Sequence, residues 1–472
     1  MTETHGVHDY DLIVVGSGSG NSLIDEEWKD KKVAIVDGGV FGGTCLNKGC
    51  IPTKMFAYPA TTAVHGLDDD RLGVSMERTD VRWREIRDRI FGRIDAISES
   101  GLEYRQKLPN VDLWTEFVTL RDPHTVETAS GQLLRGRQVV VAAGSRSVLP
   151  ELPGIDLPGV HTSDTIMRID DLPRRVVILG GGFIAAEFAG IFHGLGTEVV
   201  QVNRSRRLLR DHDEEIAERF AREASQQWDL RLDTTISSIE QGSDGLDVTL
   251  ESGGSSETLA ADVVLVATGR VSNADSLDAE GAGLDIRDGV LAVDEYQRVL
   301  SSGEPVDGVW ALGDVSSVTQ LKHLANAQER TVQHNLLHPD DLRSTDQRYV
   351  PHAVFTNPQI ASVGMSESDA RDLAAVQGFD VTVKVQDFGD VAYGWAMEDS
   401  QGFVKLVARK DTGELLGAHI IGTEASMLIQ PLIQAMSFGL TAHEMARGQF
   451  WIHPALTEVV ENALLGLEVP GN

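Results

Sequence analysis

Two glycine-rich turns constrain the fold of this chain more than any other feature. The first follows the apolar run "YDLIVV", and a second apolar run, "KKVAIVDGG", comes after it. The pattern returns near residue 175, where "RRVVILGGGFIAAEFAG" precedes "TEVVQVNRS". A buried strand, a glycine turn, a helix and a second strand form the unit that binds dinucleotides. Because this unit occurs twice, the sequence predicts an α/β fold with two Rossmann-like domains.

The pattern of the chain changes after residue 345. The stretches "YVPHAVFTNPQIASVG" and "FVKLVARKDTGELLGAHIIG" are typical of an antiparallel sheet with a hairpin turn at "TGELLG", and "SMLIQPLIQAMSFGL" is typical of helices packed on it. We therefore expect a C-terminal α+β domain over residues 346–472. The remainder is expected to form a first dinucleotide domain in two parts, 1–150 and 273–345, and a second one over 151–272.

The first glycine turn carries Gly16 and Gly18, which let the backbone approach a pyrophosphate at the start of the following helix. Asp37 stands 21 residues beyond Gly16 (37 − 16), where a carboxylate binds a ribose 2′-hydroxyl. One departure is Asn21, which occupies the position where a third small residue is usual. We expect a dinucleotide with an unmodified adenosine ribose here.

The second turn carries Gly180 and Gly182, but its second strand ends in the neutral Asn203. Four arginines then follow within seven residues. A carboxylate at this point repels a 2′-phosphate, whereas guanidinium groups bind it through paired hydrogen bonds. Arg204 and Arg210 therefore predict NADPH, the alternative being an ordinary basic surface patch. Two nucleotide sites in one chain suggest a flavin and a nicotinamide that exchange electrons.

The charge balance argues against some classes of partner. The 472 residues include 72 acidic side chains against 41 Lys plus Arg, a formal net charge of −31, which disfavours nucleic acid and anionic membranes. No apolar run approaches the ~18 residues that indicate a membrane span. The N-terminus "MTETHGVHDYD" lacks the basic start of a signal peptide. We expect a soluble cytoplasmic protein.

The only two cysteines, Cys45 and Cys50, lie within "GGTCLNKGCIPTK". Three interpretations are open: a structural clip, a zinc site completed by histidines, or a working redox pair. A disulfide needs Cα atoms within ~7 Å, whereas positions i and i+5 on a straight helix rise about 7.5 Å along its axis. The pair can therefore bridge only where a helix is broken or begins, and Gly49 offers the flexibility. A strained bridge of this kind is easily reduced, which favours the redox pair and no metal.

The same stretch resembles the active site of the class I pyridine nucleotide–disulfide oxidoreductases, a family that includes glutathione reductase and lipoamide dehydrogenase. The resemblance covers essentially the whole chain, through both glycine turns, "VVLVATGR", "ALGDV" and the C-terminal "HPALTE". It implies FAD at the first dinucleotide site, NADPH at the second, and a C-terminal domain that forms a homodimer.

By this resemblance, Cys50 is the charge-transfer thiol beside the flavin and Cys45 is the thiol that attacks the substrate. Lys54 and Glu187 match the ion pair that lies next to flavin N5 in the family.

Four further residues are expected around the flavin by the same resemblance. Asp314 matches the residue that binds the ribityl chain, and Gly43 and Thr44 belong to the stretch that contacts the cofactor. Phe183 takes the place of an aromatic gate over the flavin, often Tyr in relatives.

The C-terminal His453 and Glu458 match the family's acid–base pair, which in relatives reaches the active site of the other subunit. Histidine, with an ordinary pKa of ~6.5, can take a proton from Cys45 and return one to a leaving thiolate, while a carboxylate orients its ring. Taken alone, His453 is more typical of a packed loop histidine. The resemblance implies a homodimer with a shared active site.

Members of the family differ in the disulfide that they reduce. No cysteine follows Cys50, so the C-terminal thiols of the large thioredoxin reductases and of mercuric reductases are missing. Asn203, Arg204 and Arg210 disfavour the NADH-using lipoamide dehydrogenases. The stretches "GSGSGNS", "ATGRVSNAD", "QDFGDVAYGWAMED" and "EMARGQFWIHPAL" resemble the mycothione-reducing members from actinobacteria. This resemblance implies a reductase of the small disulfide mycothione, the alternative being a glutathione or lipoamide enzyme.

Overall fold

The computed structural model describes residues 6–68 and 72–472. The chain divides into two compact units, each assembled from separate stretches of sequence. Unit 1 comprises Met1–Thr53, Glu85–Val148 and Arg270–Gln347, and unit 2 comprises Lys54–Arg84, Leu149–Gly269 and Arg348–Asn472.

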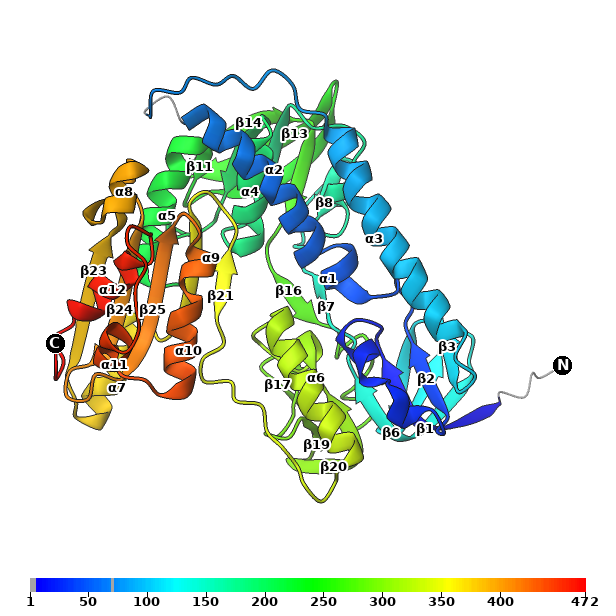
Figure 1. Ribbon diagram of the computed structural model, residues 1–472. Helices are drawn as coiled ribbons and strands as arrows, with labels where there is room; N and C mark the ends of the chain where they lie inside the picture. The colour runs from blue at the N-terminus through cyan, green and yellow to red at the C-terminus, as the bar shows by residue number, and fades with distance from the viewer. Residues whose placement is uncertain (1–5, 69–71) are drawn as a thin grey trace. The chain divides into compact units, whose positions relative to one another are not determined.

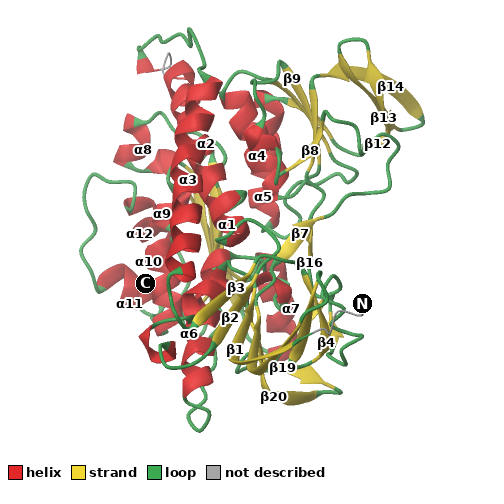
Figure 2. Ribbon diagram, turned by 90° about the vertical axis from the view of Figure 1, so that its right-hand side faces the viewer, coloured by secondary structure: helices red, strands yellow, loops and turns green. Residues whose placement is uncertain are grey.

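Unit 1 is built around a parallel sheet of the dinucleotide-binding kind (Figure 2). Strands β3, β2, β1, β6 and β20 are parallel neighbours in that order, β19 pairs antiparallel with β20, and β5 joins β4 to β6. These strands are β1 Val7–Val15, β2 Val33–Val36, β3 Val111–Trp114, β4 Val118–Asp122, β5 Thr125–Thr128, β6 Leu133–Val141, β19 Arg298–Ser301 and β20 Glu304–Ala311. The two short pairs beside the sheet are β7 Ser145–Ser147 with β16 Arg270–Ser272, and β17 Ile286–Arg287 with β18 Val290–Leu291.

The apolar runs of the first strands are explained by burial on both faces of this sheet. Leu12 and Val14 of β1 enter a core that also contains Val332 of α6 (Lys322–Leu337), whereas Ile13 and Val15 enter the core on the opposite face. Side chains alternate between the faces of a strand, so a single run supplies both cores. The long helix α3 (Trp83–Gln106) begins in unit 2 and continues into unit 1.

The α-helix expected after the first glycine turn is absent. Two short 3-10 helices, η1 (Ser19–Leu23) and η2 (Glu26–Trp28), stand in its place. Arg105 of α3 donates to the carbonyl oxygens of Asn21 at 2.6 Å and Ile24 at 3.0 Å. These carbonyls are acceptors that a continuous α-helix would use itself. Arg105 Nε also donates to the Asn21 side chain at 2.8 Å, so the unusual asparagine anchors α3 to this segment.

Unit 2 contains the second parallel sheet, with strand order β11-β10-β9-β15-β8, followed by a separate antiparallel sheet β12-β13-β14. The strands are β8 Val160–Thr162, β9 Arg175–Leu179, β10 Glu198–Val202, β11 Asp229–Arg231, β12 Thr235–Gly242, β13 Gly245–Ser252, β14 Ser255–Ala261 and β15 Val263–Val266. Helix α4 (Phe183–Gly194) connects β9 to β10, and α5 (Glu214–Gln227) connects β10 to β11. Here the predicted strand, glycine turn, helix and strand are all present.

The C-terminal part of unit 2 is the expected antiparallel sheet with helices (Figure 1). Its strand order is β21-β22-β25-β24-β23, and "TGELLG" connects β24 and β25, with Gly413 in the left-handed region at φ +75°. The strands are β21 His352–Val354, β22 Gln359–Gly364, β23 Val381–Asp387, β24 Phe403–Arg409 and β25 Leu415–Gly422. The helices are α7 Glu367–Gln377, α8 Ala392–Ala396, α9 Ala425–Leu428, α10 Gln430–Phe438, α11 Ala442–Arg447 and α12 Glu458–Leu465. Within residues 6–68 and 72–472, no helix is long and apolar enough to span a membrane.

Candidate active site

The two cysteines lie on either side of a break between two helices. Cys45 is in the middle of α1 (Gly43–Asn47), and Cys50 is the first residue of α2 (Cys50–Asp68). Neither forms a disulfide in the structure, and their side chains are hydrogen-bonded to each other. The sequence-based expectation of a broken helix between them is therefore confirmed. The contact is one that a disulfide exchange requires, because the two sulfurs must meet.

Local hydrogen bonds define this break. The Lys48 N–H donates to the Thr44 carbonyl at 3.0 Å and ends α1, while the Thr53 N–H and hydroxyl donate to the Gly49 carbonyl at 3.1 and 2.6 Å. A Cβ on Gly49 would lie 3.0 Å from the Thr44 carbonyl oxygen, so a larger residue would press the two helices apart. The chain can thus return Cys50 toward Cys45 within five residues.

The redox pair adjoins the first glycine turn. Gly43 begins α1 with φ +72°, and a Cβ on it would lie 2.6 Å from the Cα of Gly18. Only glycine permits this approach, which brings the dinucleotide turn and the start of α1 into contact. At the end of β2, Asp37 accepts from the Ser17 N–H at 2.7 Å and from the Gly39 N–H at 2.8 Å.

The environment of Cys45 holds its proton. The hydrogen bond with the Cys50 side chain raises the pKa of the Cys45 thiol far above its usual range, and burial raises it further, whereas the charge of Lys322 and a backbone hydrogen bond from Cys50 act in the opposite direction. Because the thiolate is the nucleophile, Cys45 needs a base before it can attack a disulfide. Lys322 is the first residue of α6, and its ammonium donates to the Ser19 hydroxyl of the glycine turn at 2.7 Å.

Asp314 lies on the short helix η5 (Gly313–Val315), directly after β20. Its carboxylate accepts from the Ser145 hydroxyl at 2.7 Å, and Arg270 Nε donates to the same hydroxyl at 2.9 Å. The residue is therefore held at the carboxyl end of the parallel sheet in unit 1, where such sheets bind ligands.

Lys54 and Glu187 form an ion pair although 133 residues separate them in the sequence. Lys54 Nζ lies 2.8 and 2.7 Å from the two carboxylate oxygens of Glu187, whose side chain is only 4% exposed. The Phe355 N–H also donates to Glu187 at 3.0 Å, so the buried carboxylate has a second partner. Lys54 is one turn beyond Cys50 on α2, and Phe183, the first residue of α4, is exposed.

The second glycine turn leads directly into α4. Gly180 follows β9, and Gly182 is the N-cap of α4 without a side-chain hydrogen bond to the helix N–H groups. These donors and the positive end of the helix dipole suit a pyrophosphate. Arg204 and Arg210, in the loop after β10, are exposed and have no partner within residues 6–68 and 72–472. Asn203 is 7% exposed and turns its amide into that loop.

His453 and Glu458 are hydrogen-bonded at the C-terminal end of the chain. His453 Nδ1 lies 2.7 Å from Glu458 Oε1, and the Ala455 N–H donates to the other oxygen at 3.3 Å. An ionised carboxylate only accepts hydrogen bonds, so Nδ1 carries the proton and Nε2 is left to exchange one. The side chain of His453 is 72% exposed and that of Glu458 18%, so a largely exposed ring is held by a partly buried carboxylate.

These residues fit two dinucleotides. Gly18 and Gly43 lie close together without side chains, so a phosphate can approach the backbone there. The uncapped start of α4, with free Arg204 and Arg210, suits a second phosphate-bearing ligand. Among the residues that the structure describes, no group of three or more His, Cys, Asp or Glu side chains is arranged to hold a metal.

Sequence reasoning missed several residues that shape these sites. Ser17 and Ser145 hold the two expected acidic residues, and Arg105, Lys322 and Phe355 bind segments far away in the sequence. No spacing or motif marks these partners, because each contact is made by the tertiary fold.

Comparison with known proteins agrees with this geometry. The family model described as pyridine nucleotide-disulphide oxidoreductase matches residues 10–331, and the dimerisation domain of the same family matches residues 350–464. The chain is 54% identical to mycothione reductase of Mycobacterium tuberculosis (strain ATCC 25618 / H37Rv), covering 97% of this chain and 99% of the relative. It is 32% identical to glutathione reductase of Nostoc sp. (strain PCC 7120 / SAG 25.82 / UTEX 2576), covering 95% and 98%.

A solved structure shares the whole architecture. The Cu(II) complex of the HOCl-induced flavoprotein disulfide reductase RclA from Escherichia coli matches with a TM-score of 0.83 at 25% identity, covering 97% of this chain and 99% of that one. This chain therefore belongs to the pyridine nucleotide-disulphide oxidoreductase family. The predicted α/β fold with a dimerisation domain, the enzyme class and the family's cofactors, FAD and NADPH, are confirmed.

Proposed function

We propose that this chain is an NADPH-dependent flavoprotein that reduces mycothione to two molecules of mycothiol. The observation that supports this substrate is the 54% identity over 97% of the chain to mycothione reductase of M. tuberculosis, against 32% to the glutathione reductase of Nostoc. The hydrogen-bonded dithiol supports the chemistry, because disulfide reduction needs one thiol to attack and a second to resolve.

The two cofactors are assigned to the two dinucleotide turns. FAD is held in unit 1 by the turn of Gly16 and Gly18 with Asp37, Gly43, Thr44 and Asp314, and Lys54 contributes from α2. NADPH is held in unit 2 by Gly180, Gly182, Arg204 and Arg210. The FAD domain then comprises residues 1–150 and 273–345, the NADPH domain 151–272 and the interface domain 346–472.

Bound FAD would supply electron transfer between NADPH and the Cys45–Cys50 disulfide, which becomes two thiols on receiving two electrons and two protons. Lys54, paired with Glu187, places a positive charge one helical turn from Cys50. The net reaction consumes NADPH, one proton and one disulfide, and it yields NADP⁺ and two thiols.

The substrate half-reaction begins at Cys45. His453 of the partner subunit takes the proton of Cys45, whose thiolate attacks one sulfur of mycothione. The substrate S–S bond breaks, a mixed disulfide forms on Cys45, and the first mycothiol leaves with the proton that His453 returns. Cys50 then attacks the sulfur of Cys45, the internal disulfide re-forms, and the second mycothiol leaves with the proton that the Cys50 thiol gives up. Glu458 orients His453 and stabilises its protonated form.

This scheme needs a homodimer whose active sites combine both chains. The dimerisation domain of the family matches residues 350–464, which include His453 and Glu458. The high exposure of the His453 ring in the single chain supports a role toward a second subunit. We place the enzyme in the cytoplasm, where a reducing environment suits a cycling thiol pair, and expect neither nucleic acid nor membrane as partner.

Steady-state kinetics on the purified FAD holoenzyme test the proposal. Mycothione, oxidised glutathione and oxidised lipoamide are compared, each with NADPH and with NADH. The proposal predicts the highest kcat/KM for mycothione with NADPH. A higher kcat/KM for oxidised glutathione or for lipoamide assigns the chain to those enzymes instead.

A further inference from the structure

The loop that carries the arginines of the second dinucleotide site runs from Asn203 to Asp213 and is called the arginine loop here. Its four arginines differ in their surroundings. Arg206 pairs with Asp233 at 3.3 Å, and Arg207 donates to the His212 carbonyl at 3.0 Å within the loop. Arg204 and Arg210 are exposed and have no partner among the described residues. A ligand phosphate therefore meets two free guanidinium groups, whereas those of Arg206 and Arg207 are already paired.

The first end of the arginine loop is fixed inside the dinucleotide domain. Asn203 Nδ2 donates to the Ser205 carbonyl at 2.9 Å and to the Arg207 carbonyl at 3.1 Å, which folds the loop back on itself. A Cβ on Gly181 would lie 2.5 Å from Asn203 Oδ1, and the Leu209 N–H donates to the Gly181 carbonyl at 2.8 Å. The first end thus lies directly against the glycine turn.

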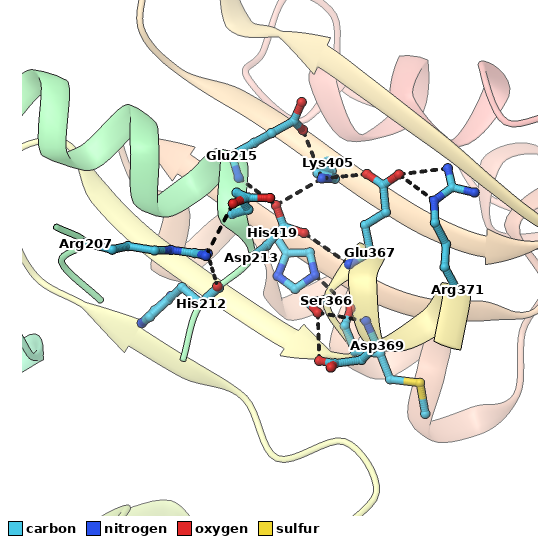
Figure 3. Close-up of polar contacts among 12 residues, drawn as sticks. Arg207, His212, Asp213, Glu215, Ser366, Glu367, Asp369, Arg371, Lys405 and His419 are labelled. Carbon is cyan, nitrogen blue, oxygen red and sulfur yellow. Dashed lines mark hydrogen bonds and ion pairs between the residues drawn. The ribbon is translucent and has the colours of Figure 1, made fainter. Parts of the chain in front are cut away.

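The second end is fixed by the C-terminal sheet, from 192 residues away in the sequence. Asp213 is the N-cap of α5, and its carboxylate also accepts from Lys405 Nζ at 3.0 Å and from the Glu367 N–H at 3.1 Å. The side chains of Lys405 and Asp213 are 3% and 2% exposed. Figure 3 shows the ammonium of Lys405 among the carboxylates of Asp213, Glu215 and Glu367.

Lys405 belongs to the middle of β24, opposite His419 of β25, so its position is set by the sheet rather than by its own flexibility. It completes three ion pairs, at 3.0 Å to Asp213, 2.9 Å to Glu215 and 2.8 Å to Glu367. Burial alone raises the pKa of Asp213, but the Glu367 N–H, His419 and Lys405 together bring it below its ordinary value. Asp213 is therefore a buried carboxylate that depends on these partners for its charge.

We propose that Lys405 is a positioning residue for NADPH: by holding Asp213, it fixes the second end of the arginine loop and so aims Arg210 and Arg204 at the 2′-phosphate. Arg210 lies three residues before Asp213 (213 − 210), so a shift of the α5 start moves it directly. This inference rests on the proposed use of NADPH at the second glycine turn. It makes the coenzyme preference of one domain depend on a side chain of another.

The test uses the FAD holoenzyme with three variants. Lys405→Met removes the charge at similar length, and Lys405→Arg keeps it. The double variant Lys405→Met/Asp213→Asn removes the ion pair without leaving a buried charge, and asparagine is still a good N-cap. Lys410→Met is the matched control, because Lys410 follows β24 directly but pairs at the surface with Glu468 at 2.7 Å.

For each protein we measure the affinities for 2′,5′-ADP and 5′-ADP, and the KM values for NADPH and NADH. A purely structural role would change stability but not the ratio between these ligands. For Lys405→Met and the double variant we expect about a tenfold loss of affinity for 2′,5′-ADP and about a tenfold rise in KM for NADPH, the size of one weakened charge-assisted hydrogen bond. Affinity for 5′-ADP, KM for NADH and kcat should change much less. Lys405→Arg should recover part of the preference, and Lys410→Met should retain it.

Each outcome has a distinct meaning. A wild-type enzyme that binds 2′,5′-ADP no better than 5′-ADP contradicts the proposed use of NADPH itself. If the wild type prefers 2′,5′-ADP and Lys405→Met shows the same ratio of affinities for 2′,5′-ADP and 5′-ADP, the proposed role of Lys405 is overturned. If Lys405→Met does not fold, the same comparison is made with the double variant. If neither Lys405→Met nor the double variant gives folded holoenzyme, Lys405 serves folding alone, and the proposal is also overturned.

Discussion

Cys45 and Cys50 share a hydrogen bond although they belong to two different helices, α1 and α2. The bond is possible because the helical path is interrupted at Lys48 and Gly49, which turns the start of α2 back toward Cys45. It also makes the two thiols unequal, since it holds the proton on Cys45. This inequality gives each sulfur a separate task in the proposed reaction.

Replacement of Cys45, the proposed attacking thiol, should separate the two half-reactions. In Cys45→Ser, NADPH should still reduce the bound flavin, because Cys50 and both dinucleotide turns are intact. Turnover of mycothione should fall to background, because serine cannot form the mixed disulfide. Stopped-flow absorbance of the flavin and steady-state assays measure the two steps. Undiminished turnover in this variant would show that Cys45 is not the nucleophile.

Loss of His453, the proposed acid–base residue, should lower kcat without preventing reduction of the flavin by NADPH. His453→Gln should reduce mycothione turnover by about 10²–10⁴-fold, the usual contribution of a positioned general acid–base group. Glu458→Gln should have a smaller effect, because the amide still holds the ring at the Nδ1 side. Pre-steady-state reduction of the flavin by NADPH is the control and should stay near the wild-type rate.

A mixed dimer tests whether the active site is shared. Chains with Cys45→Ser and chains with His453→Gln are each inactive as homodimers in this account. Their heterodimer should regain activity at one of its two sites, because that site combines the intact Cys45 of one chain with the intact His453 of the other. If both residues act within one chain, the heterodimer stays inactive.

The two free arginines should determine coenzyme choice. Arg204→Ala and Arg210→Ala should each raise KM for NADPH about tenfold, since each removes a charge-assisted hydrogen bond to the 2′-phosphate. KM for NADH, which lacks this phosphate, should change little. Arg206→Ala is the control, because Arg206 already pairs with Asp233. An equal rise in both KM values would instead indicate general damage to the domain.

Acid should destabilise the enzyme partly through His212. Burial, followed by the charges of His352, His419 and Arg207, lowers the pKa of His212 to about 3. An unfolded histidine titrates near ~6.5, so above that pH the group contributes nothing to the pH dependence. Between the two values the unfolded chain binds one more proton, and unfolding becomes easier by about 1.4 kcal/mol for each pH unit that the pH falls.

The melting temperature of His212→Gln should therefore fall less than that of the wild type when the pH is lowered from about 7 to about 5. The thermal midpoint of the FAD holoenzyme at each pH measures this difference. His338→Gln, at an exposed histidine, should show the wild-type slope. Equal slopes in the wild type and His212→Gln would show that His212 is not kept neutral by burial.

The sequence predicted the features that depend on neighbouring residues and missed those made by distant ones. The glycine turns, the broken helix at Gly49 and the hairpin of β24 and β25 all follow from local patterns. The missing helix after Gly18 does not, because Arg105 supplies its competing hydrogen bonds from α3. The same limit applies to Lys405 and Asp213, whose contact joins segments 192 residues apart in the sequence.

The site residues show the same difference between features set by neighbouring residues and features made by distant ones. The pairing of Lys54 with Glu187 is predicted only by the family resemblance, because 133 residues separate them and no sequence motif indicates that they are in contact. Asn203 was expected to be a neutral replacement for a carboxylate, and the structure adds that its amide folds the arginine loop. Spacing identifies which backbone approaches a phosphate, but not which side chain holds that backbone in place.

The most direct test of the account is to trap the mixed disulfide. In Cys50→Ser the resolving thiol is absent, so Cys45 should attack mycothione, release one mycothiol per site and keep the other as a stable adduct. Mass spectrometry of the peptide that contains residues 42–54 locates it. We predict one mycothiol on Cys45, and a much slower reaction with oxidised glutathione at the same concentration. An unmodified Cys45 after incubation with mycothione would contradict the central claim that this sulfur carries electrons to the substrate.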